Sequence, residues 1–325
     1  MRILVTGGAG YIGGTVAGLL VRGGHQVTVY DNLCHSERDM VPQGVDFVPG
    51  DIADRVKLEK LFDNQPFDGV MHFAALIEAG ESMNVPEIYF RNNTASTLSL
   101  LEAMLAKGVK RLVFSSTAAV YGEPESVPVR EDAPKKPTNP YGESKLLVEQ
   151  MLGWLNQAHD FRYASLRYFN VAGAEPGRGQ SHEPYSHLIP IVLDVALGRR
   201  NSITIHGRDY PTVDGTCVRD YIHVLDLAGA HLLAFEALEN HSRLIYNLGN
   251  GRGFSVREVV ESARRVTGHP IPVVEGPRRP GDPAVLIASS EKISEELGWR
   301  AQFAELDAIV GSAWAWHKVR FGPKN

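Results

Sequence analysis

The feature that most constrains this chain is a glycine pattern near its amino end. Gly8, Gly10 and Gly13 form G-x-G-x-x-G between an apolar run at 2–6 and an apolar, helix-spaced stretch at 11–22. In a strand–turn–helix unit the first glycine permits a tight turn, the second lets the backbone approach a pyrophosphate, and the third lets the helix pack on the strand. The amides and dipole of the helix then receive the phosphate charge. With these flanks, the pattern predicts a dinucleotide site and not merely a connecting turn.

An acidic residue follows at the distance that such a site requires. Asp31 stands 18 residues after Gly13, at the end of the second predicted strand. Its carboxylate can accept hydrogen bonds from both ribose hydroxyls and would repel a 2′-phosphate. No arginine follows at Asn32 or Leu33, so NAD is favoured over NADP. Asp51, after the third predicted strand, fits two interpretations equally, a contact with the adenine or the N-cap of the next helix.

Short β-rich runs alternate with helical stretches through the first half of the chain. Such alternation implies βαβ units, and therefore an α/β fold with a Rossmann-like, doubly wound parallel sheet. Strands are predicted at 2–6, 26–30, 45–48, 69–73, 110–115 and 163–167, and helices at 11–22, 56–64 and 146–157. Beyond about residue 170, glycine, proline and longer loops become frequent, which predicts a smaller C-terminal α/β substrate domain. We expect an NAD-binding domain at 1–171, with a segment near 217–245 returning to it, and the smaller domain at 172–325.

The composition excludes several classes of protein. Lys and Arg number 33 and Asp and Glu 38, and the net charge of −5 argues against nucleic-acid and anionic-membrane partners. No apolar run approaches the roughly 18 residues of a membrane helix, and the start MRILVTGGAG is not a signal peptide. Cys34 and Cys217 are too few for a disulfide framework, and the histidines, His223 among them, lack metal-ligand spacing. We expect a soluble, cytoplasmic protein without a metal.

Tyr141 and Lys145 form Y-x-x-x-K, which places both side chains on one face of a helix. A free tyrosine, with a pKa of about 10, is too weakly acidic to serve as a base near neutral pH. A neighbouring ammonium and the positive nicotinamide of bound NAD would both favour the phenolate. The alternative is a surface Tyr–Lys pair. Ser115, Ser116 and Thr117 argue against it, because hydroxyls at the carboxyl end of a parallel strand lie where open α/β sheets bind ligands. A hydroxyl there can share the proton of a substrate alcohol with the phenolate.

Longer motifs extend the pattern over the rest of the chain. The sequence contains, in order, VTGGAGYIGG, YDNLCHSERD, HFAALIEAGES, FSSTAAVYGE, NPYGESK, LRYFNVAGA, GRDYPTVDGTCVRDYIHV and RRPGDPA. In these motifs the chain resembles the extended short-chain dehydrogenases/reductases and, among them, the UDP-glucose 4-epimerases. The glycine turn and Y-x-x-x-K are generic to the superfamily, whereas the last two motifs are much narrower.

The resemblance implies a role for each matching residue. Tyr141 would be the catalytic base, Lys145 its partner and Thr117 the catalytic hydroxyl. The contacts of the NAD would be Gly7, Gly10, Tyr11, Ile12, Asp31, Asn32, Asp51, Ile52, Phe73, Ala74, Ala75, Asn92, Ser115, Tyr141, Lys145 and Tyr168. The contacts of a UDP-sugar would be Thr117, Tyr141, Asn170, His187, Leu188, Thr204, Arg219, Arg279, Asp282 and Leu286. The activity implied is reversible C4 epimerisation of a UDP-hexose, UDP-galactose to UDP-glucose, through a transient 4-keto sugar. The resemblance also implies retained NAD and a homodimer.

Some positions depart from the family pattern. Ile77 replaces a lysine near the nicotinamide ribose, and His187 replaces an asparagine beside the UDP. Leu286 stands where a bulky tyrosine excludes N-acetyl sugars and a small residue admits them, so epimerisation of a UDP-N-acetylhexosamine, pentose or uronate stays open. A nucleotide-sugar 4,6-dehydratase is disfavoured because Ala118 and Ala119 stand where those enzymes carry Asp-Glu. A non-catalytic NAD sensor is disfavoured by the retained Tyr–Lys pair.

Overall fold

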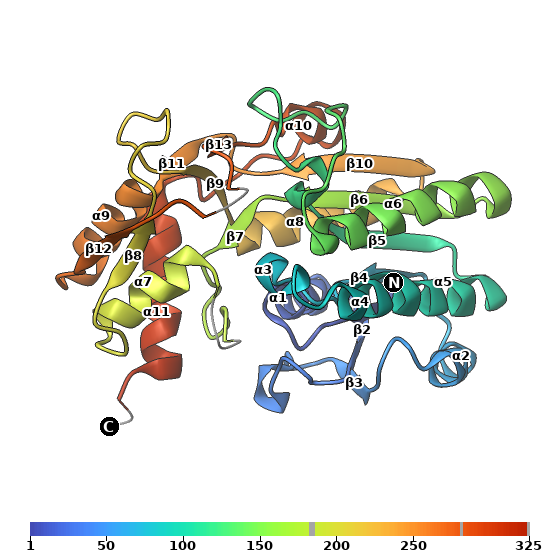
Figure 1. The fold of residues 1–325 in the computed structure, drawn as a ribbon. Coiled ribbons are helices and arrows are strands. Elements are labelled where there is room, and N and C mark those ends of the chain that lie inside the picture. The colour runs from blue at the N-terminus through green and yellow to red at the C-terminus, as the bar shows by residue number, and fades with distance from the viewer. Residues whose placement is uncertain (182–185, 280–281, 324–325) are drawn as a thin grey trace. The chain divides into compact units, whose positions relative to one another are not determined.

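The computed structural model describes residues 1–181, 186–279 and 282–323, and the chain divides into two units (Figure 1). Unit 1 comprises residues 1–122, 134–167 and 228–246, and unit 2 comprises residues 123–133, 168–227 and those from 247 onward.

This division differs in detail from the boundaries expected from the sequence. The chain passes from unit 1 into the main part of unit 2 after residue 167, whereas the sequence led us to expect this boundary after residue 171. The segment that returns to unit 1 is 228–246 instead of 217–245. Residues 123–133 belong to unit 2, where Val129 forms a β-bridge with Ala288. Because these two residues are far apart in the sequence, no local sequence pattern could have predicted that they pair.

Unit 1 is built on a seven-stranded parallel sheet in the order β10-β6-β5-β4-β1-β2-β3. The strands are β1 (Arg2–Thr6), β2 (Gln26–Asp31), β3 (Asp46–Pro49), β4 (Gly69–His72), β5 (Arg111–Thr117), β6 (Arg162–Tyr168) and β10 (Arg243–Leu248). The predicted Rossmann-like fold is confirmed. The strand order reverses between β1 and β4, and open sheets of this kind bind ligands at the carboxyl ends of the strands beside such a point.

Helices cover both faces of this sheet. They are α1 (Tyr11–Arg22), α2 (Arg55–Asn64), α5 (Ser96–Ala106), α6 (Pro140–His159) and α8 (Val224–Ala237), with the short turns α3 (Ala79–Ser82), α4 (Pro86–Tyr89), the π-helical η2 (Phe90–Ala95) and η3 (Ala118–Tyr121). Leu4 and Val70 belong to a buried apolar cluster with side chains of α2, α5 and α6. Successive strand residues point to opposite faces. Gly69 therefore faces away from this cluster, and its backbone lies against Phe235 of α8.

The helix that carries Tyr141 begins at Pro140, as the Y-x-x-x-K spacing requires, and extends the helix predicted at 146–157 toward its amino end. The side chain of Asn139 accepts the amide hydrogen of Gly142 at 2.8 Å, and Pro140 occupies the first helical position. Both features favour a helix start. Tyr141 and Lys145 therefore lie on the first two turns of α6.

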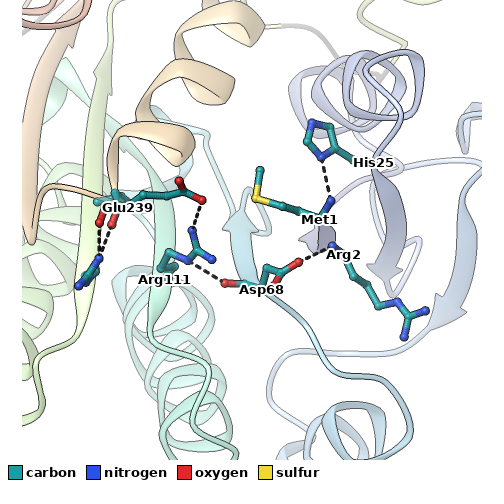
Figure 2. Close-up of polar contacts among 8 residues, drawn as sticks. Met1, Arg2, His25, Asp68, Arg111 and Glu239 are labelled. Atoms are coloured by element: carbon teal, nitrogen blue, oxygen red, sulfur yellow. Dashed lines mark hydrogen bonds and ion pairs between the residues drawn. The ribbon is translucent and has the colours of Figure 1, made fainter.

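Polar contacts tie the amino ends of the strands together, at the edge opposite the glycine turn (Figure 2). The Arg2 amide donates to the Asp68 carboxylate at 2.7 Å, and Arg111 Nε donates to the Asp68 carbonyl at 3.1 Å. Arg111 also forms an ion pair with Glu239, which follows α8, at 3.3 Å. These contacts anchor β1, β5 and the end of α8. They involve only the amino ends of the strands, so the carboxyl ends remain available for a ligand site.

Unit 2 contains two small sheets, in which β9 pairs with β7, β11 and β13, and β12 pairs with β8. Its strands are β7 (Asn170–Ala172), β8 (Ile203–His206), β9 (Val218–His223), β11 (Gly253–Ser255), β12 (Val273–Gly276) and β13 (Val285–Leu286). Its helices include α7 (Leu188–Ala196), α9 (Val256–Thr267), α10 (Glu291–Leu297) and α11 (Leu306–Phe321). Side chains of α7, α9 and α11 share one buried apolar cluster with Tyr221 of β9. Within the described ranges, no helix is both long and apolar enough to cross a bilayer.

Candidate active site

The turn between β1 and α1 requires glycine at two positions. Gly7 has a φ of +73°, and a Cβ there would lie 2.5 Å from the Ala74 amide nitrogen. A Cβ on Gly13 would lie 2.4 Å from the Gly7 carbonyl oxygen. The left-handed residue of the turn is therefore Gly7, and the tight-turn role expected for Gly8 is corrected. Gly10 is the N-cap of α1 and supplies no side-chain acceptor, and the first turn of α1 carries no acidic residue. This helix end suits an anionic ligand.

Asp31 is fixed at the carboxyl end of β2 by backbone amides. Its Oδ2 accepts from Ala9 of the glycine turn at 3.0 Å, and its Oδ1 accepts from Leu33 at 2.8 Å. The carboxylate is thus attached to the turn that would hold the pyrophosphate. A ribose bound beside that turn would meet a carboxylate that is already oriented.

The two interpretations of Asp51 can now be separated. The N-cap of α2 is Asp54, whose side chain accepts the Lys57 amide at 3.0 Å, so the capping interpretation of Asp51 is wrong. Asp51 instead accepts from Asn32 Nδ2 at 2.8 Å and from the Ala53 amide at 2.8 Å. Its contact with an adenine stays a prediction. Ile52 is buried in the apolar cluster, which leaves its main chain for any contact with the adenine.

The loop after β4 contains Phe73, Ala74 and Ala75, which were expected along the cofactor. The Phe73 amide donates to the Thr6 carbonyl at 2.9 Å, and the backbone of Ala74 lies against Gly7. The loop therefore borders the glycine turn directly. Asn92 of η2 donates to Asn93 Oδ1 at 2.9 Å. Ile77 is 45% exposed and supplies no cation at the position where the resemblance led us to expect a lysine.

Thr117, Tyr141 and Lys145 come together at the carboxyl end of β5. The Thr117 side chain lies beside the Tyr141 phenol and favours its ionised form. Thr117 Oγ1 accepts the Ala119 amide at 3.1 Å. Lys145 Nζ donates to the Ser115 carbonyl at 2.8 Å. The side chain of Lys145 is buried. This grouping of a phenol, a hydroxyl and an amine is the arrangement predicted from the sequence.

Burial governs the protonation of this group in the chain without ligands. It raises the pKa of Tyr141, and the side chain of Thr117 offsets part of that effect, whereas the charge of Glu78 adds to it. Burial also lowers the pKa of Lys145 from 10.5 to about 7. The lowering of the Tyr141 pKa expected beside an ammonium and bound NAD stays a prediction. An uncharged phenol is the resting form.

Further residues position Tyr141, and the sequence patterns did not single them out. Ser82 Oγ accepts the Tyr141 amide at 3.2 Å, and Ser144 Oγ donates to the Tyr141 carbonyl at 2.7 Å. Asn93 Nδ2 donates to Ser144 Oγ at 3.1 Å and to the Leu76 carbonyl at 2.9 Å. Asn93 thus connects the loop after β4 to the catalytic turn of α6. Ser82 lies in the quoted motif HFAALIEAGES and Ser144 in NPYGESK, but neither motif by itself indicated a contact with Tyr141.

In unit 2, β9 brings together three of the residues expected to bind the UDP-sugar. Arg219 Nη2 donates to Asp282 Oδ1 at 2.7 Å, and Arg219 pairs in register with Leu286 of β13. Asp282 also donates its amide to the Arg279 carbonyl at 3.3 Å. Pro280 and Gly281, which belong to the same motif, lie outside the described residues. A half-buried arginine with a carboxylate partner suits binding of a diphosphate.

The other residues expected to bind the UDP-sugar lie on separate elements of unit 2. Asn170 pairs with Tyr221 in the β7–β9 register. His187 is the N-cap of α7 without a side-chain cap and contacts Gln180 Nε2 through Nδ1 at 3.2 Å. Leu188 packs on the apolar cluster of unit 2, Thr204 is exposed on β8, and Tyr168, expected beside the NAD, is the last residue of β6.

His223 has a structural environment. It contacts Ser312 Oγ through Nε2 at 2.9 Å and accepts the Leu225 amide through Nδ1 at 3.1 Å. Burial lowers its pKa to about 4. In the part of the chain that the structure describes, no group of histidine, cysteine or acidic side chains is arranged to hold a metal ion.

Comparisons with known proteins agree with this geometry. The model of the NAD dependent epimerase/dehydratase family matches residues 3–249. The chain is 57% identical over 317 residues to a UDP-glucose 4-epimerase of Streptomyces lividans, covering 97% of this chain and 96% of that protein. It is 53% identical over 321 residues to a UDP-glucose 4-epimerase of Halalkalibacterium halodurans, covering 98% and 96%. A crystal structure of UDP-glucose 4-epimerase from Brucella ovis in complex with NAD matches with a TM-score of 0.94 and 44% identity over 97% of both chains.

Proposed function

The chain belongs to the NAD dependent epimerase/dehydratase family, and from this premise we propose that it interconverts UDP-galactose and UDP-glucose by inverting C4 of the hexose. One observation carries the proposal. The phenol of Tyr141 lies beside the hydroxyl of Thr117, and Lys145, one helical turn further on, is anchored to the Ser115 carbonyl. All three side chains lie at the carboxyl edge of a sheet whose glycine turn suits a dinucleotide. A binding protein has no need for a buried phenol, hydroxyl and amine at this place.

The residues present fit NAD. Gly7 and Gly13 let the turn pack against its own backbone, where a Cβ would collide, and the N-cap Gly10 leaves the first turn of α1 without a side-chain acceptor. Asp31, oriented by two backbone amides, would accept from the ribose hydroxyls. Asn32 and Asp51 would lie toward the adenosine. Bound NAD would supply a reversible hydride acceptor and a positive charge.

The residues of this chain would move the proton and hold the sugar. Tyr141, as phenolate, would take the proton of the 4-hydroxyl while Thr117 donates a hydrogen bond that shares the developing charge. C4 would thereby be oxidised to a ketone, with its hydride passing to bound NAD. After the sugar turns over, the hydride would return to the other face of C4, and Tyr141 would give the proton back to the 4-oxygen. Arg219, Arg279 and Asp282 would hold the UDP throughout, so that the keto sugar stays bound while its ring is free to turn.

Tyr141 must lose a proton that the free chain retains. Burial raises the pKa of Tyr141, so the charge needed to form the phenolate comes from binding and not from Lys145 alone. The Lys145 pKa of about 7 means that this amine can become an ammonium near neutral pH when an anion forms beside it. We infer that the base is activated only in the loaded enzyme.

The size of Leu286 suggests a second candidate substrate. Leu286, which is partly exposed and lies beside Arg219 in the β9–β13 register, is smaller than tyrosine, so a UDP-N-acetylhexosamine is the next substrate to test. Pentose and uronate forms belong to the same panel. A 4,6-dehydratase is disfavoured because the apolar Ala118 and Ala119 follow Thr117 and supply no acid for the elimination of water.

The test uses the purified protein without added NAD. Given UDP-galactose, it should form UDP-glucose, separable by ion-pair chromatography, because the cofactor is regenerated in each turnover and stays bound. Tyr141→Phe should abolish the conversion. Bound NAD without turnover of any UDP-sugar would instead favour a sensor, and an active Phe variant would refute the role of Tyr141.

We also propose that the protein is a cytoplasmic homodimer that serves galactose metabolism. Leu98 of α5 and Trp154 of α6 are 41% and 70% exposed, and apolar side chains on these two helices are suited to a contact with a second copy. Light scattering after size exclusion measures the oligomeric state. A monomer at micromolar concentration would overturn the homodimer.

A further inference from the structure

The end of β5 is attached to α6 at three successive residues. At the first, Lys145 Nζ donates to the Ser115 carbonyl, and at the second, Thr117 lies beside the Tyr141 phenol, as described above. The third joins Ser116 and Glu149, where the Ser116 hydroxyl donates to Glu149 Oε1 at 2.5 Å. Glu149 stands four residues after Lys145 and eight after Tyr141, so the three helix residues share one face of α6.

Glu149 is itself held by a neighbouring strand. Arg167 of β6 donates to Glu149 through Nε at 2.9 Å and through Nη2 at 2.6 Å, and its Nη1 donates to the Tyr121 hydroxyl at 2.6 Å. Arg167 is 1% exposed and Glu149 7%. Burial opposes the charge of Arg167, but its hydrogen bonds and attraction to Glu149 outweigh that effect and leave its pKa above the ordinary value. The carboxylate therefore sits in one rigid geometry.

A buried ion pair of this kind is poorly explained by stability alone. Apolar side chains of similar volume often pack such a position as well or better, because two charges need not be taken out of water. What the ion pair adds is a fixed position for the Glu149 carboxylate. It holds Glu149 in one place against Ser116, next to the two β5 residues that contact Tyr141 and Lys145.

We propose that Glu149, held by Arg167, is a positioning residue that acts through Ser116 to fix the register of α6 on β5, and with it the contact between Tyr141 and Thr117. The inference rests on the proposed function for its catalytic readout. Loss of the Ser116 contact would let the helix shift against the strand, and a displacement of about 1 Å in such a site can lower a rate about 100-fold.

The variant that tests this is Ser116→Ala, which removes the contact and leaves the Glu149–Arg167 pair in place. The matched control is Ser165→Ala. Ser165 is a buried serine on β6 of the same sheet, and its hydroxyl has no hydrogen-bond partner among the described residues. Both changes delete one buried hydroxyl, but only the first breaks a contact with α6.

We expect Ser116→Ala to lower kcat with UDP-galactose by about 10- to 100-fold, while KM changes by less than about twofold. The acid limb of its kcat profile should move to higher pH, because a loosened Thr117 contact raises the pKa of Tyr141. Ser165→Ala should match the wild type in all three measurements. If Ser116→Ala only lowers the melting temperature and keeps the wild-type kcat and pH profile, Glu149 is merely structural and the inference is overturned.

Amide exchange of the segment 139–147, followed by mass spectrometry on the folded proteins, separates this inference from the proposed function. Faster exchange in Ser116→Ala than in Ser165→Ala supports the positioning contact even if the wild type converts no UDP-sugar, an outcome that would refute the proposed function alone. Equal exchange in the two variants would overturn the inference whatever the activity.

Discussion

Asp220 makes the stability of unit 2 depend on pH. Its carboxylate is fully buried on β9, next to Arg219. It accepts the amides of Asn250 at 2.6 Å, Gly251 at 3.0 Å and Ala288 at 3.1 Å. Burial raises its pKa from 3.8 to about 6, although the three hydrogen bonds oppose that change. The carboxylate therefore connects β9 to the segment after β13 while burying a charge at neutral pH.

The sign of the effect follows from proton linkage. Because the folded-state pKa is the higher one, the folded chain binds more protons than the unfolded chain between about pH 3.8 and 6. The contribution of Asp220 to stability is complete at acid pH and is lost as the pH rises toward 6. Between pH 4.5 and 7 this loss amounts to about 2 kcal/mol.

The variant that tests this is Asp220→Asn, which removes the titratable carboxylate. It also places an NH2 group, which cannot accept a hydrogen bond, against backbone amides that donate to Asp220. The free-energy difference between wild type and variant should fall by about 2 kcal/mol from pH 4.5 to 7 and stay constant above pH 7. Urea unfolding followed by tryptophan fluorescence in a Trp154→Phe background measures it, because the other three tryptophans all lie in unit 2. A difference that is constant from pH 4.5 to 8, or that grows with pH, would refute the argument.

Further predictions concern the site and its supports. Thr117→Ala should lower kcat by about 100-fold and move the acid limb of the rate profile to higher pH, since the bond that favours the phenolate is lost; an unshifted limb would contradict the Thr117–Tyr141 contact. Arg167→Met should cost about 3 to 5 kcal/mol in urea unfolding followed by circular dichroism, because it leaves a buried carboxylate unpaired, and a cost under about 1 kcal/mol would speak against the pair. Gly13→Ala should yield protein that purifies without NAD, because the new Cβ would lie 2.4 Å from the Gly7 carbonyl; a stoichiometric nucleotide in its acid extract would disprove this. Leu286→Gly should raise the rate with UDP-N-acetylgalactosamine relative to UDP-galactose in a competition assay, and an unchanged ratio would remove Leu286 as the determinant of sugar size.

Local signals predicted the cofactor edge well. The glycine pattern, its flanking strand and helix, and the position of Asp31 depend on contacts within about thirty residues, so spacing alone was informative. The prediction did not single out Gly7, which has a φ of +73° and lies against the backbone of Ala74 in the loop after β4. The pattern of letters does not show that contact.

Groups that support the catalytic turn could not be predicted in the same way. Ser82 and Asn93 reach α6 across 59 and 51 residues of sequence. Their contacts depend on how α3 and η2 pack on α6. A serine or an asparagine on a short helix has many possible partners, and the sequence gives no reason to prefer Tyr141 or Ser144. Likewise, Asp51 and Asp54 are both plausible caps, and only the amide of Lys57 decides between them.

The pKa of Tyr141 shows why spacing alone did not predict the protonation of the empty site. A lysine one helical turn from a tyrosine suggests an ammonium that stabilises a phenolate, but burial acts on both groups and favours their neutral forms. Charge brought by the ligands has to reverse this balance. A base that forms only when cofactor and nucleotide sugar are both bound would deprotonate only a sugar that bound NAD can oxidise and then reduce again before release.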